Sequence, residues 1–462
     1  MSHDTASRTA RDTAELQRAA RDHLWSSFGG PGTYAEDEPI VLVRADGSEV
    51  FDSDGKRYLD GISALEAMVV GHGRPELAEV AAAQMNELAF LDLFRYSSVP
   101  AIELAERLAA LTPGDLSRVF LTPGGAEADE VAIKIALQYH HLNGEPARQK
   151  ILTRAGAFHG STVGAMVLDG NYWATSNYIY EGYATRGRIV APPACPSCDW
   201  GKGARHLPCP HRVEETIRAE RPETVAAVVV DPAASAIAVA VPPPEYLVEL
   251  RRICDEYGVL LIADEVITGF GRTGRMFCSD HSGVAPDLMT LSKGLSSGYA
   301  PIGATVVSER IAQRFVDSSL PTLRHGHTYG GHPVACAVAL ANLEIIERER
   351  LSERAAENGA YMLDGLWSLE HHPTFWDARG IGLLAGLELV ADREGNDFDN
   401  PGVVGTRLRK VCRANGLITL PLHPGAVMFF APPLVITRTE IDELVDVFDR
   451  SLTEVERELG VG

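Results

Sequence analysis

The chain has 462 residues, of which 45% are apolar and 23% are charged, a composition typical of a folded enzyme and unlike that of a disordered chain. Acidic residues outnumber Lys and Arg by 63 to 42, and the formal charge of −21 opposes binding to nucleic acid or to an anionic membrane surface. The seven Cys and a polar N-terminus without an apolar signal core favour a cytoplasmic location.

The N-terminal part of the chain reads as an arm followed by a β-meander. Short β-type segments alternate with Asp-Gly turns in "IVLVRADGSEVFDSDGKRYLD", a pattern typical of hairpins. We assign residues 1–69 to this arm and to part of a small domain. The most apolar stretch, residues 226–244, is interrupted by Asp231 and Pro232 and lacks the ~20 continuous apolar residues that a membrane-spanning helix needs.

From about residue 70 onward, helical patterns alternate with compact strands. The strands are predicted at 118–122, 150–154, 225–231, 259–264 and 287–292. This alternation predicts an α/β fold with a mostly parallel sheet that helices cover on both faces. We place the large domain at 70–335, and a C-terminal small domain of α+β type at 336–462.

Two unusual residues follow buried strands of this sheet, at the edge where ligands bind in open parallel sheets. Asp264 ends one predicted strand and Lys293 follows the next. A buried carboxylate is tolerated when it faces a fixed cation, and a partly desolvated amine loses its proton and can condense with an aldehyde. Taken singly, the Asp is more often a helix N-cap and the Lys an ordinary exposed residue.

A third feature is the segment "LTPGGAEADEVAIKIA", where a strand runs through Gly124 and Gly125 into a helix that begins near Ala126. Glycines and a helix N-terminus favour a phosphate, although a Gly-Gly pair often signals only a tight turn. The motif is neither a nucleotide P-loop nor GxGxxG. A cation, an aldehyde and a phosphate together predict pyridoxal 5′-phosphate, with Asp264 on its pyridine nitrogen and Lys293 as Schiff-base and proton-transfer residue.

Longer motifs make the chain similar to one family over nearly its whole length. It resembles the class-III (ω-amino acid and amine) aminotransferases of pyridoxal-phosphate fold type I. The resemblance rests on the segments "GAEADEVAIKIA", "FHG", "PPPEYLVELRRICDEYGVLLIADEVITGFGRTG", "PDLMTLSKGLSSGYAPIGA" and "HTYGGHPVACAVALANLEI".

The resemblance implies further cofactor contacts and a homodimer with shared active sites. Phe158 would stack on one face of the ring, Val266 would pack on the other, and His159 of the same "FHG" motif would contact the cofactor. Gly125 and Ala126 would donate backbone N–H groups to the phosphate. Thr328 would reach that phosphate from the neighbouring subunit.

Departures from the family pattern bear on the substrate. Glu66 stands near the pocket mouth where many relatives have an aromatic residue, Leu420 stands where relatives that handle keto acids have a mobile Arg, and Asp231 replaces a Glu. Gain of an anion and loss of a cation favour a donor with a second positive charge, such as a polyamine or an aminosugar. The alternative is that Glu66 points to solvent while another arginine, Arg95 or Arg324, serves the co-substrate.

We therefore expect ping-pong transfer of an amino group from a primary amine to a keto acid or aldehyde. An ω-amino acid:pyruvate aminotransferase, a mutase, an epimerase and a decarboxylase on the same fold, and a catalytically silent scaffold, remain alternatives. A final group has spacing compatible with structural zinc, but nearby prolines favour a plain surface loop and no metal is assigned. Its members are Cys195, Cys198, Cys209 and His211.

Overall fold

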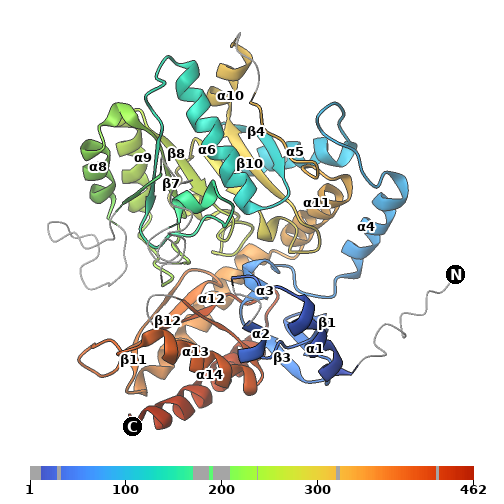
Figure 1. The fold of residues 1–462 in the computed structure, drawn as a ribbon, viewed down its shortest axis with the longest axis vertical. Helices are drawn as coiled ribbons and strands as arrows, with labels where there is room; N and C mark the ends of the chain where they lie inside the picture. Colours follow the sequence, from blue (N-terminus) through green and yellow to red (C-terminus); the bar gives the residue numbers. More distant parts are fainter. Residues whose placement is uncertain are drawn as a thin grey trace.

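The computed structural model describes residues 12–28, 33–169, 187–190, 209–236, 238–318, 323–422 and 426–461. Figure 1 shows a large α/β part above a smaller part. In the smaller part, the N-terminal strands lie beside C-terminal helices and strands. Within the described residues, none of the helices is long and apolar enough to cross a bilayer.

A seven-stranded sheet forms the centre of the large part, with strand order β4-β10-β9-β8-β7-β5-β6. β10 runs antiparallel to both of its neighbours, whereas the other pairs are parallel. The predicted mostly parallel α/β sheet is thus confirmed, with one antiparallel strand that periodicity did not reveal. The strands are β4 Leu116–Thr122, β5 Lys150–Arg154, β6 Gly187–Val190, β7 Val225–Val230, β8 Leu260–Asp264, β9 Leu288–Leu291 and β10 Gly303–Ser308.

Helices cover both faces of this sheet because its central strands are apolar on both sides. In β8, Leu260 and Ile262 join the core cluster that contains α6 residues, whereas Leu261 joins the cluster that contains α9 residues, as the two-residue period of a strand requires. α6 spans Gly125–Leu142 and α9 spans Glu245–Tyr257. α6 packs over β4, β10, β9, β8 and β7, so its N-terminus is fixed near the carboxyl ends of the central strands.

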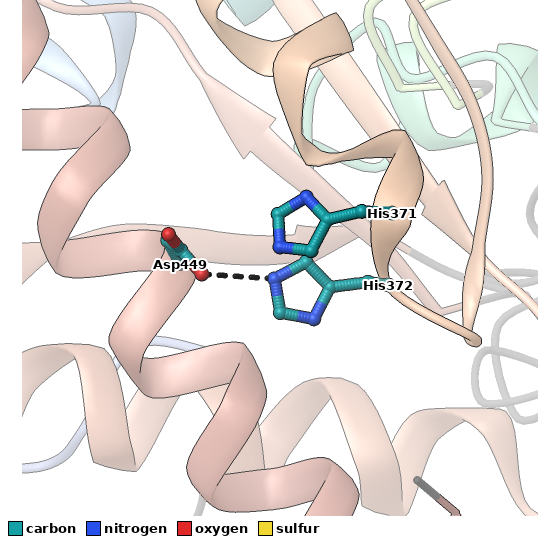
Figure 2. Close-up of side chains that lie close together, drawn as sticks. All are labelled: His371, His372 and Asp449. Carbon is teal, nitrogen blue, oxygen red and sulfur yellow. Dashed lines mark hydrogen bonds and ion pairs between the residues drawn. The ribbon is translucent and has the colours of Figure 1, made fainter.

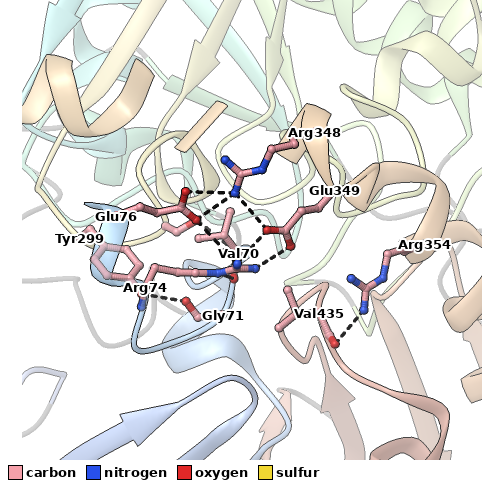
Figure 3. Close-up of polar contacts among 10 residues, drawn as sticks. Val70, Gly71, Arg74, Glu76, Tyr299, Arg348, Glu349, Arg354 and Val435 are labelled. Carbon is pink, nitrogen blue, oxygen red and sulfur yellow. Dashed lines mark hydrogen bonds and ion pairs between the residues drawn. The ribbon is translucent and has the colours of Figure 1, made fainter. Parts of the chain in front are cut away.

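Three helices form a layer beside the sheet, α4 (Pro75–Glu87), α5 (Val99–Leu111) and α11 (Pro333–Arg348), with α11 packed on both of the others. Figure 3 shows how charged side chains join the start of α4 to the end of α11. Both terminal nitrogens of Arg74 lie 2.7 Å from the Glu349 carboxylate. This bidentate pair fixes the start of α4 against the end of α11. α4 is the next helix after Glu66 in the sequence.

The smaller part contains two four-stranded sheets. One has the order β1-β2-β3-β13 and the other β11-β12-β15-β14. β13 pairs in parallel with β3, so residues near both ends of the chain share one sheet. The strands are β1 Leu42–Asp46, β2 Glu49–Asp52, β3 Arg57–Asp60, β11 Phe375–Gly380, β12 Ala385–Leu389, β13 Leu417–Ile418, β14 Leu420–Leu422 and β15 Ala426–Phe430.

The remaining helices flank these sheets or the edges of the central one. α14 begins with a capping box in which the Thr437 and Glu440 side chains bond reciprocally to the backbone, and it packs against α12 and α13. These helices are α1 Thr13–His23, α2 Thr33–Glu36, α3 Ser63–Glu66, α8 Pro210–Ala219, α10 Glu309–Val316, α12 Leu351–Trp367, α13 Pro401–Ala414 and α14 Arg438–Leu459.

Candidate active site

Asp264 and Lys293 follow two adjacent strands of the central sheet. β8 and β9 pair in parallel, with Asp264 opposite Thr290, so both residues leave the sheet at the same edge. Lys293 has φ +40°, a left-handed conformation that costs a residue with a side chain about 1–2 kcal/mol. The Ser292 hydroxyl donates to the Ile302 carbonyl at 2.8 Å and fixes the turn that presents this lysine.

The Asp264 carboxylate is held by two contacts inside a buried site. Its Oδ1 accepts the Val266 N–H at 2.9 Å, and its Oδ2 lies 2.7 Å from Nδ1 of His159. Nε2 of His159 lies 3.1 Å from the Thr153 hydroxyl. Burial alone would lower the pKa of His159, but the hydrogen bond and charge of Asp264 raise it to about 9, so the imidazolium keeps the carboxylate paired and oriented.

Two more acids lie beside this pair, and the sequence motifs did not single them out. Asp129, on the buried face of α6, groups with His159 and Asp264 so that one polar atom of each lies within 4.8 Å of the others. Burial, and then the charge of Asp264, raise the pKa of Asp129 well above its usual value. Asp169 accepts the His159 backbone N–H at 2.9 Å, and burial raises its pKa to about 7. For Asp129, the signal in the sequence was an acid at an apolar helix position.

The N-terminus of α6 forms a narrow backbone cradle. Gly124 is the N-cap and supplies no side-chain cap, so the first N–H groups of the helix remain available to an anion. A methyl group on Gly160 would lie 2.4 Å from the Ala126 Cβ, and one on Gly303 would lie 2.4 Å from the Gly124 carbonyl oxygen. Glycine is therefore required where these segments enclose the turn.

This cradle lies next to the other two features. A Cβ built on Gly125 would be 3.0 Å from Val266 and 3.5 Å from the Cβ of Ser292. Val266 is two residues beyond Asp264, and Ser292 directly precedes Lys293. An uncapped helix N-terminus, a buried carboxylate and an amine therefore lie close together, which is the donor set that the phosphate, ring nitrogen and aldehyde of pyridoxal phosphate require.

Three residues were expected to contact the cofactor: Phe158 and Val266 on the two faces of its ring, and Thr328 from a second subunit. Phe158 is half-buried, with its ring centroid 6.0 Å from that of Phe28. Val266 is half-buried beside the cradle. Thr328 is exposed in the single chain, where it is accessible to another subunit.

Glu66 lies directly at the lysine. Its Oε2 is 2.5 Å from Nζ of Lys293, and the residue is only 6% exposed. The alternative that Glu66 points to solvent is therefore wrong. Since the two residues are 227 positions apart, this contact could not be read from local sequence.

An unusual turn holds Glu66 in this position. Ser63, Ala64, Leu65 and Glu66 all have positive φ, between 48° and 80°, so the short α3 is a left-handed turn built without glycine. Such a turn costs about 1–2 kcal/mol per residue and persists only where surrounding contacts determine it.

Arg272 supplies such contacts from a fully buried position. Its guanidinium donates to the Ser63 hydroxyl at 3.0 Å and to the carbonyls of Leu383 and Pro432 at 2.9 and 2.5 Å. Burial lowers the pKa of Arg272 to about 10, against the charges of Glu66 and Asp60, which raise it. Arg272 thus links the loop after β8 to the Glu66 turn.

Glu265, the acid next to Asp264, has a structural role. It is fully buried and accepts hydrogen bonds from the Thr268 hydroxyl at 2.5 Å, from the Cys278 N–H at 2.9 Å, and from both the N–H and the hydroxyl of Ser279 at 2.8 Å. This network fixes the loop after β8. Of the two consecutive acids, Asp264 faces the site, and Glu265 holds the loop that follows β8 in place.

The other residues considered from the sequence are placed as follows. Asp231 is buried and paired with Arg154, which also donates to the Asp231 carbonyl at 2.6 Å. Leu420 is half-buried in β14. In the proposed cysteine group, Cys209 is the buried N-cap of α8 and His211 lies in its first turn. Cys195 and Cys198 lie outside the described residues.

Comparison with known proteins shows the family of the chain. The family model of class-III aminotransferases matches residues 33–452. A probable aminotransferase of Mycobacterium tuberculosis is 39% identical over 456 residues, covering 96% of each chain. A putrescine–pyruvate aminotransferase of Pseudomonas aeruginosa is 35% identical over 455 residues, covering 96% of this chain and 97% of its own.

Solved structures give the same result. An (S)-enantioselective ω-transaminase of Thermomicrobium roseum superposes with a TM-score of 0.89 at 40% identity, covering 96% of this chain and 99% of its own. The ω-transaminase of Pseudomonas jessenii, solved with PMP, gives 0.90 at 34% identity, covering 97% and 99%. The fold is the pyridoxal-phosphate fold type I, and the expected cofactor and enzyme class are confirmed. The chain belongs to the class-III aminotransferases, which depend on pyridoxal phosphate.

Proposed function

We propose that this aminotransferase takes its amino group from a primary amine that carries a second positive charge, such as a diamine, polyamine or aminosugar, and passes it to a keto acid or aldehyde. The observation that carries the proposal is the contact between the Glu66 carboxylate and Nζ of Lys293. The aminotransferase class itself does not depend on this contact.

We assign the catalytic roles common to the family to the residues at the carboxyl ends of β8 and β9. Pyridoxal phosphate supplies an aldehyde and a ring that stabilises negative charge at the substrate carbon. Lys293 would hold the cofactor through Nζ and would serve as the base and acid that moves the substrate proton. Asp264, oriented by His159, holds the proton on the pyridine nitrogen, while Phe158 and Val266 pack on the two ring faces.

The phosphate is assigned to the cradle of Gly124, Gly125 and Ala126, where the N-terminus of α6 is uncapped. We further propose a homodimer in which Thr328 of one subunit completes the phosphate site of the other. The exposure of Thr328 in the single chain supports this role. The molecular mass in solution tests whether the protein is a homodimer.

Glu66 would select the donor by its charge. In the free chain it pairs with the Lys293 ammonium. With the cofactor bound to the Lys293 nitrogen, Glu66 would lose that ammonium partner and stay buried, which is costly unless another cation pairs with it. A donor that brings a second ammonium restores the pair, whereas a monoamine or an ω-amino acid does not.

Two positions that depart from the family pattern agree with a cationic donor. Leu420 stands where a mobile arginine was expected, and Asp231 is already engaged by Arg154. Arg95 and Arg324 are exposed in the single chain and remain candidates for binding the acceptor carboxylate. The similarity to a putrescine–pyruvate aminotransferase supports a diamine donor, and the relatives and solved structures named above are aminotransferases, which favours transfer over a mutase, epimerase or decarboxylase outcome.

The test is the first half-reaction, followed by the absorbance change of the bound cofactor. 1,4-Diaminobutane, butylamine and 4-aminobutanoate are compared because they share a four-carbon chain and differ in the distal group. We expect the diamine to give the highest specificity constant, and Glu66→Gln to reduce its advantage over butylamine about tenfold, equivalent to about 1.4 kcal/mol.

The matched control is Glu79→Gln, which alters an exposed glutamate on α4 and should leave the ratio unchanged. A wild-type preference for 4-aminobutanoate, or an unchanged ratio in Glu66→Gln, would contradict the donor assignment while leaving the aminotransferase class intact. Absence of a half-reaction with every amine would contradict the broader activity.

A further inference from the structure

A second group of candidate ligands lies in the smaller part of the molecule, where the 3-10 helix η7 (Ser368–His371) meets α14. Figure 2 shows the imidazoles of His371 and His372 one above the other, with Asp449 of α14 beside them. One ligand atom from each of the three residues lies within 4.8 Å of the others. None of the three takes part in the site described above.

His372 is held in the orientation of a metal ligand. Its Nδ1 lies 2.7 Å from the Glu456 carboxylate, and its Nε2 lies 2.9 Å from Asp449. Glu456 is itself fixed, because its other oxygen accepts the hydroxyl and the N–H of Thr374 at 2.6 and 3.2 Å. Metal-binding histidines commonly donate their second N–H to a carboxylate in this way.

His371 has the complementary arrangement. Its Nδ1 lies 3.1 Å from the Ser368 carbonyl oxygen, which can only accept, so Nδ1 carries the proton and the lone pair is on Nε2. In Figure 2 the nitrogen of His371 nearer to Asp449 is the one farther from its backbone. Arg393 donates to the carbonyls of Glu370 and His371, each at 3.0 Å, and fixes the turn.

We propose that His371 Nε2, His372 Nε2 and the Asp449 carboxylate bind a divalent transition-metal ion such as Zn²⁺. Two imidazoles and one carboxylate suit zinc, with water in the remaining position. The ion replaces the proton between His372 and Asp449, and that proton is released to solvent. With Glu456 ionised, the cluster carries a charge of about −1 with the proton and about zero with the ion.

A simpler explanation is that the proton alone holds this cluster together. Burial opposes the charge on His372, but the hydrogen bonds of Glu456 and Asp449 raise its pKa, and the resulting ion pairs fasten η7 to α14. That explanation gives no role to the exposed His371, whose ring centroid is 4.3 Å from that of His372. The two explanations therefore differ at His371.

The test is calorimetric titration of the full-length holoenzyme with ZnCl₂ at pH about 6 and about 8. All proteins in the comparison carry Cys195→Ser and Cys198→Ser, so that these two cysteines do not contribute to zinc binding. We expect one equivalent to bind, more tightly at the higher pH because a proton must leave, with a binding enthalpy that depends on the ionisation enthalpy of the buffer.

The diagnostic variants are His371→Ala and Asp449→Asn, with His141→Ala as control because His141 is exposed on α6. The first two should weaken zinc binding at least tenfold and abolish the zinc-dependent rise in melting temperature, and the control should change neither. Zinc affinity that is unchanged in His371→Ala, or an equal loss in His141→Ala, would show adventitious surface binding. Absence of binding at millimolar zinc would also overturn the proposal.

Discussion

Nδ1 of His159 lies 2.7 Å from Oδ2 of Asp264, and neither side chain has appreciable exposure. The contact joins the end of β8 to the loop after β5. It places a cation behind the carboxylate that faces the proposed ring position. One residue of the "FHG" motif thus pairs with the buried Asp264 side chain and orients it.

The first prediction concerns this pair and pH. The pKa of His159 is raised to about 9 in the folded protein from about 6.5 in the unfolded chain. A raised pKa means that the imidazolium contributes stability in full below pH ~6.5, and that this contribution is lost as the pH rises through ~9. His159→Gln should remove on the order of 3 kcal/mol at pH 6, measured by urea unfolding.

The pH profile separates this effect from simple loss of packing. Wild type should lose more stability between pH ~7 and ~9 than His159→Gln loses over the same window. His141→Gln, at an exposed position, is the control and should retain the wild-type slope. Parallel profiles for wild type and His159→Gln would show that the pair does not carry the charge assigned to it.

The second prediction concerns Asp129. Its carboxyl is buried without a hydrogen bond of standard geometry among the described residues, and its pKa is raised well above the usual value. Because the raised pKa favours the protonated form in the folded state, its contribution to stability is present below pH ~4 and is lost as the pH rises toward the folded pKa. Asp129→Asn, which is always neutral, should gain about 1–3 kcal/mol at neutral pH.

The gain should shrink as the pH falls below ~4, where wild-type Asp129 becomes protonated in both states. Chemical unfolding at several pH values measures this, with the exposed Asp399→Asn as control. A loss of stability in Asp129→Asn that is the same at every pH would mean that the carboxyl makes a favourable contact in the native protein.

The third prediction tests the phosphate cradle. An added methyl group in Gly160→Ala would meet Ala126 at 2.4 Å, and φ is +125°, so the first turn of α6 must shift. Overpacking of this kind costs about 1–3 kcal/mol, which we expect to appear as about 10- to 100-fold weaker cofactor binding in a fluorescence titration.

Gly144→Ala is the matched control for this prediction. Gly144 also has a positive φ, +80°, but nothing lies within 4 Å of an added Cβ. It should lose some folding stability through backbone strain and keep its affinity for the cofactor. Equal weakening of cofactor binding in both variants would assign the effect to general destabilisation.

Local patterns predicted much of this architecture. The strand expected at 118–122 is found at Leu116–Thr122, and that expected at 259–264 is found at Leu260–Asp264. Each strand is a short buried apolar run between polar breaks, and this pattern is local. The convergence of Asp264 and Lys293 also followed from the sequence, because adjacent parallel strands end at one edge.

Contacts that depend on the tertiary fold were not predictable. The sequence placed Glu66 near the pocket mouth, but no local pattern indicates a left-handed turn at Ser63–Glu66 without glycine, or the contact with Lys293. Asp129 is an acid on the apolar face of its helix, but only the packing of α6 on the sheet brings it beside Asp264. Pairing of β3 with β13 likewise depends on how distant segments fold together.

The fourth prediction concerns Arg272, which supports the Glu66 turn through its hydrogen bond to the Ser63 hydroxyl. Arg272→Lys keeps the charge but cannot reproduce a guanidinium that bonds to the Ser63 hydroxyl and to the carbonyls of Leu383 and Pro432. Leaving buried acceptors unsatisfied should cost about 1–3 kcal/mol in unfolding free energy. Because the left-handed turn is strained, we also expect it to relax and to withdraw Glu66 from Lys293.

The effect on donor preference shows whether Arg272 positions Glu66 or only stabilises the fold. If Arg272 positions Glu66, then Arg272→Lys should reduce the preference for 1,4-diaminobutane over butylamine, and the double variant with Glu66→Gln should show no further reduction. The coupling in this double-mutant cycle is the measured quantity. Additive losses in the preference would mean that Arg272 and Glu66 act independently, since a residue that works only by holding Glu66 in place has no effect once the carboxylate is gone.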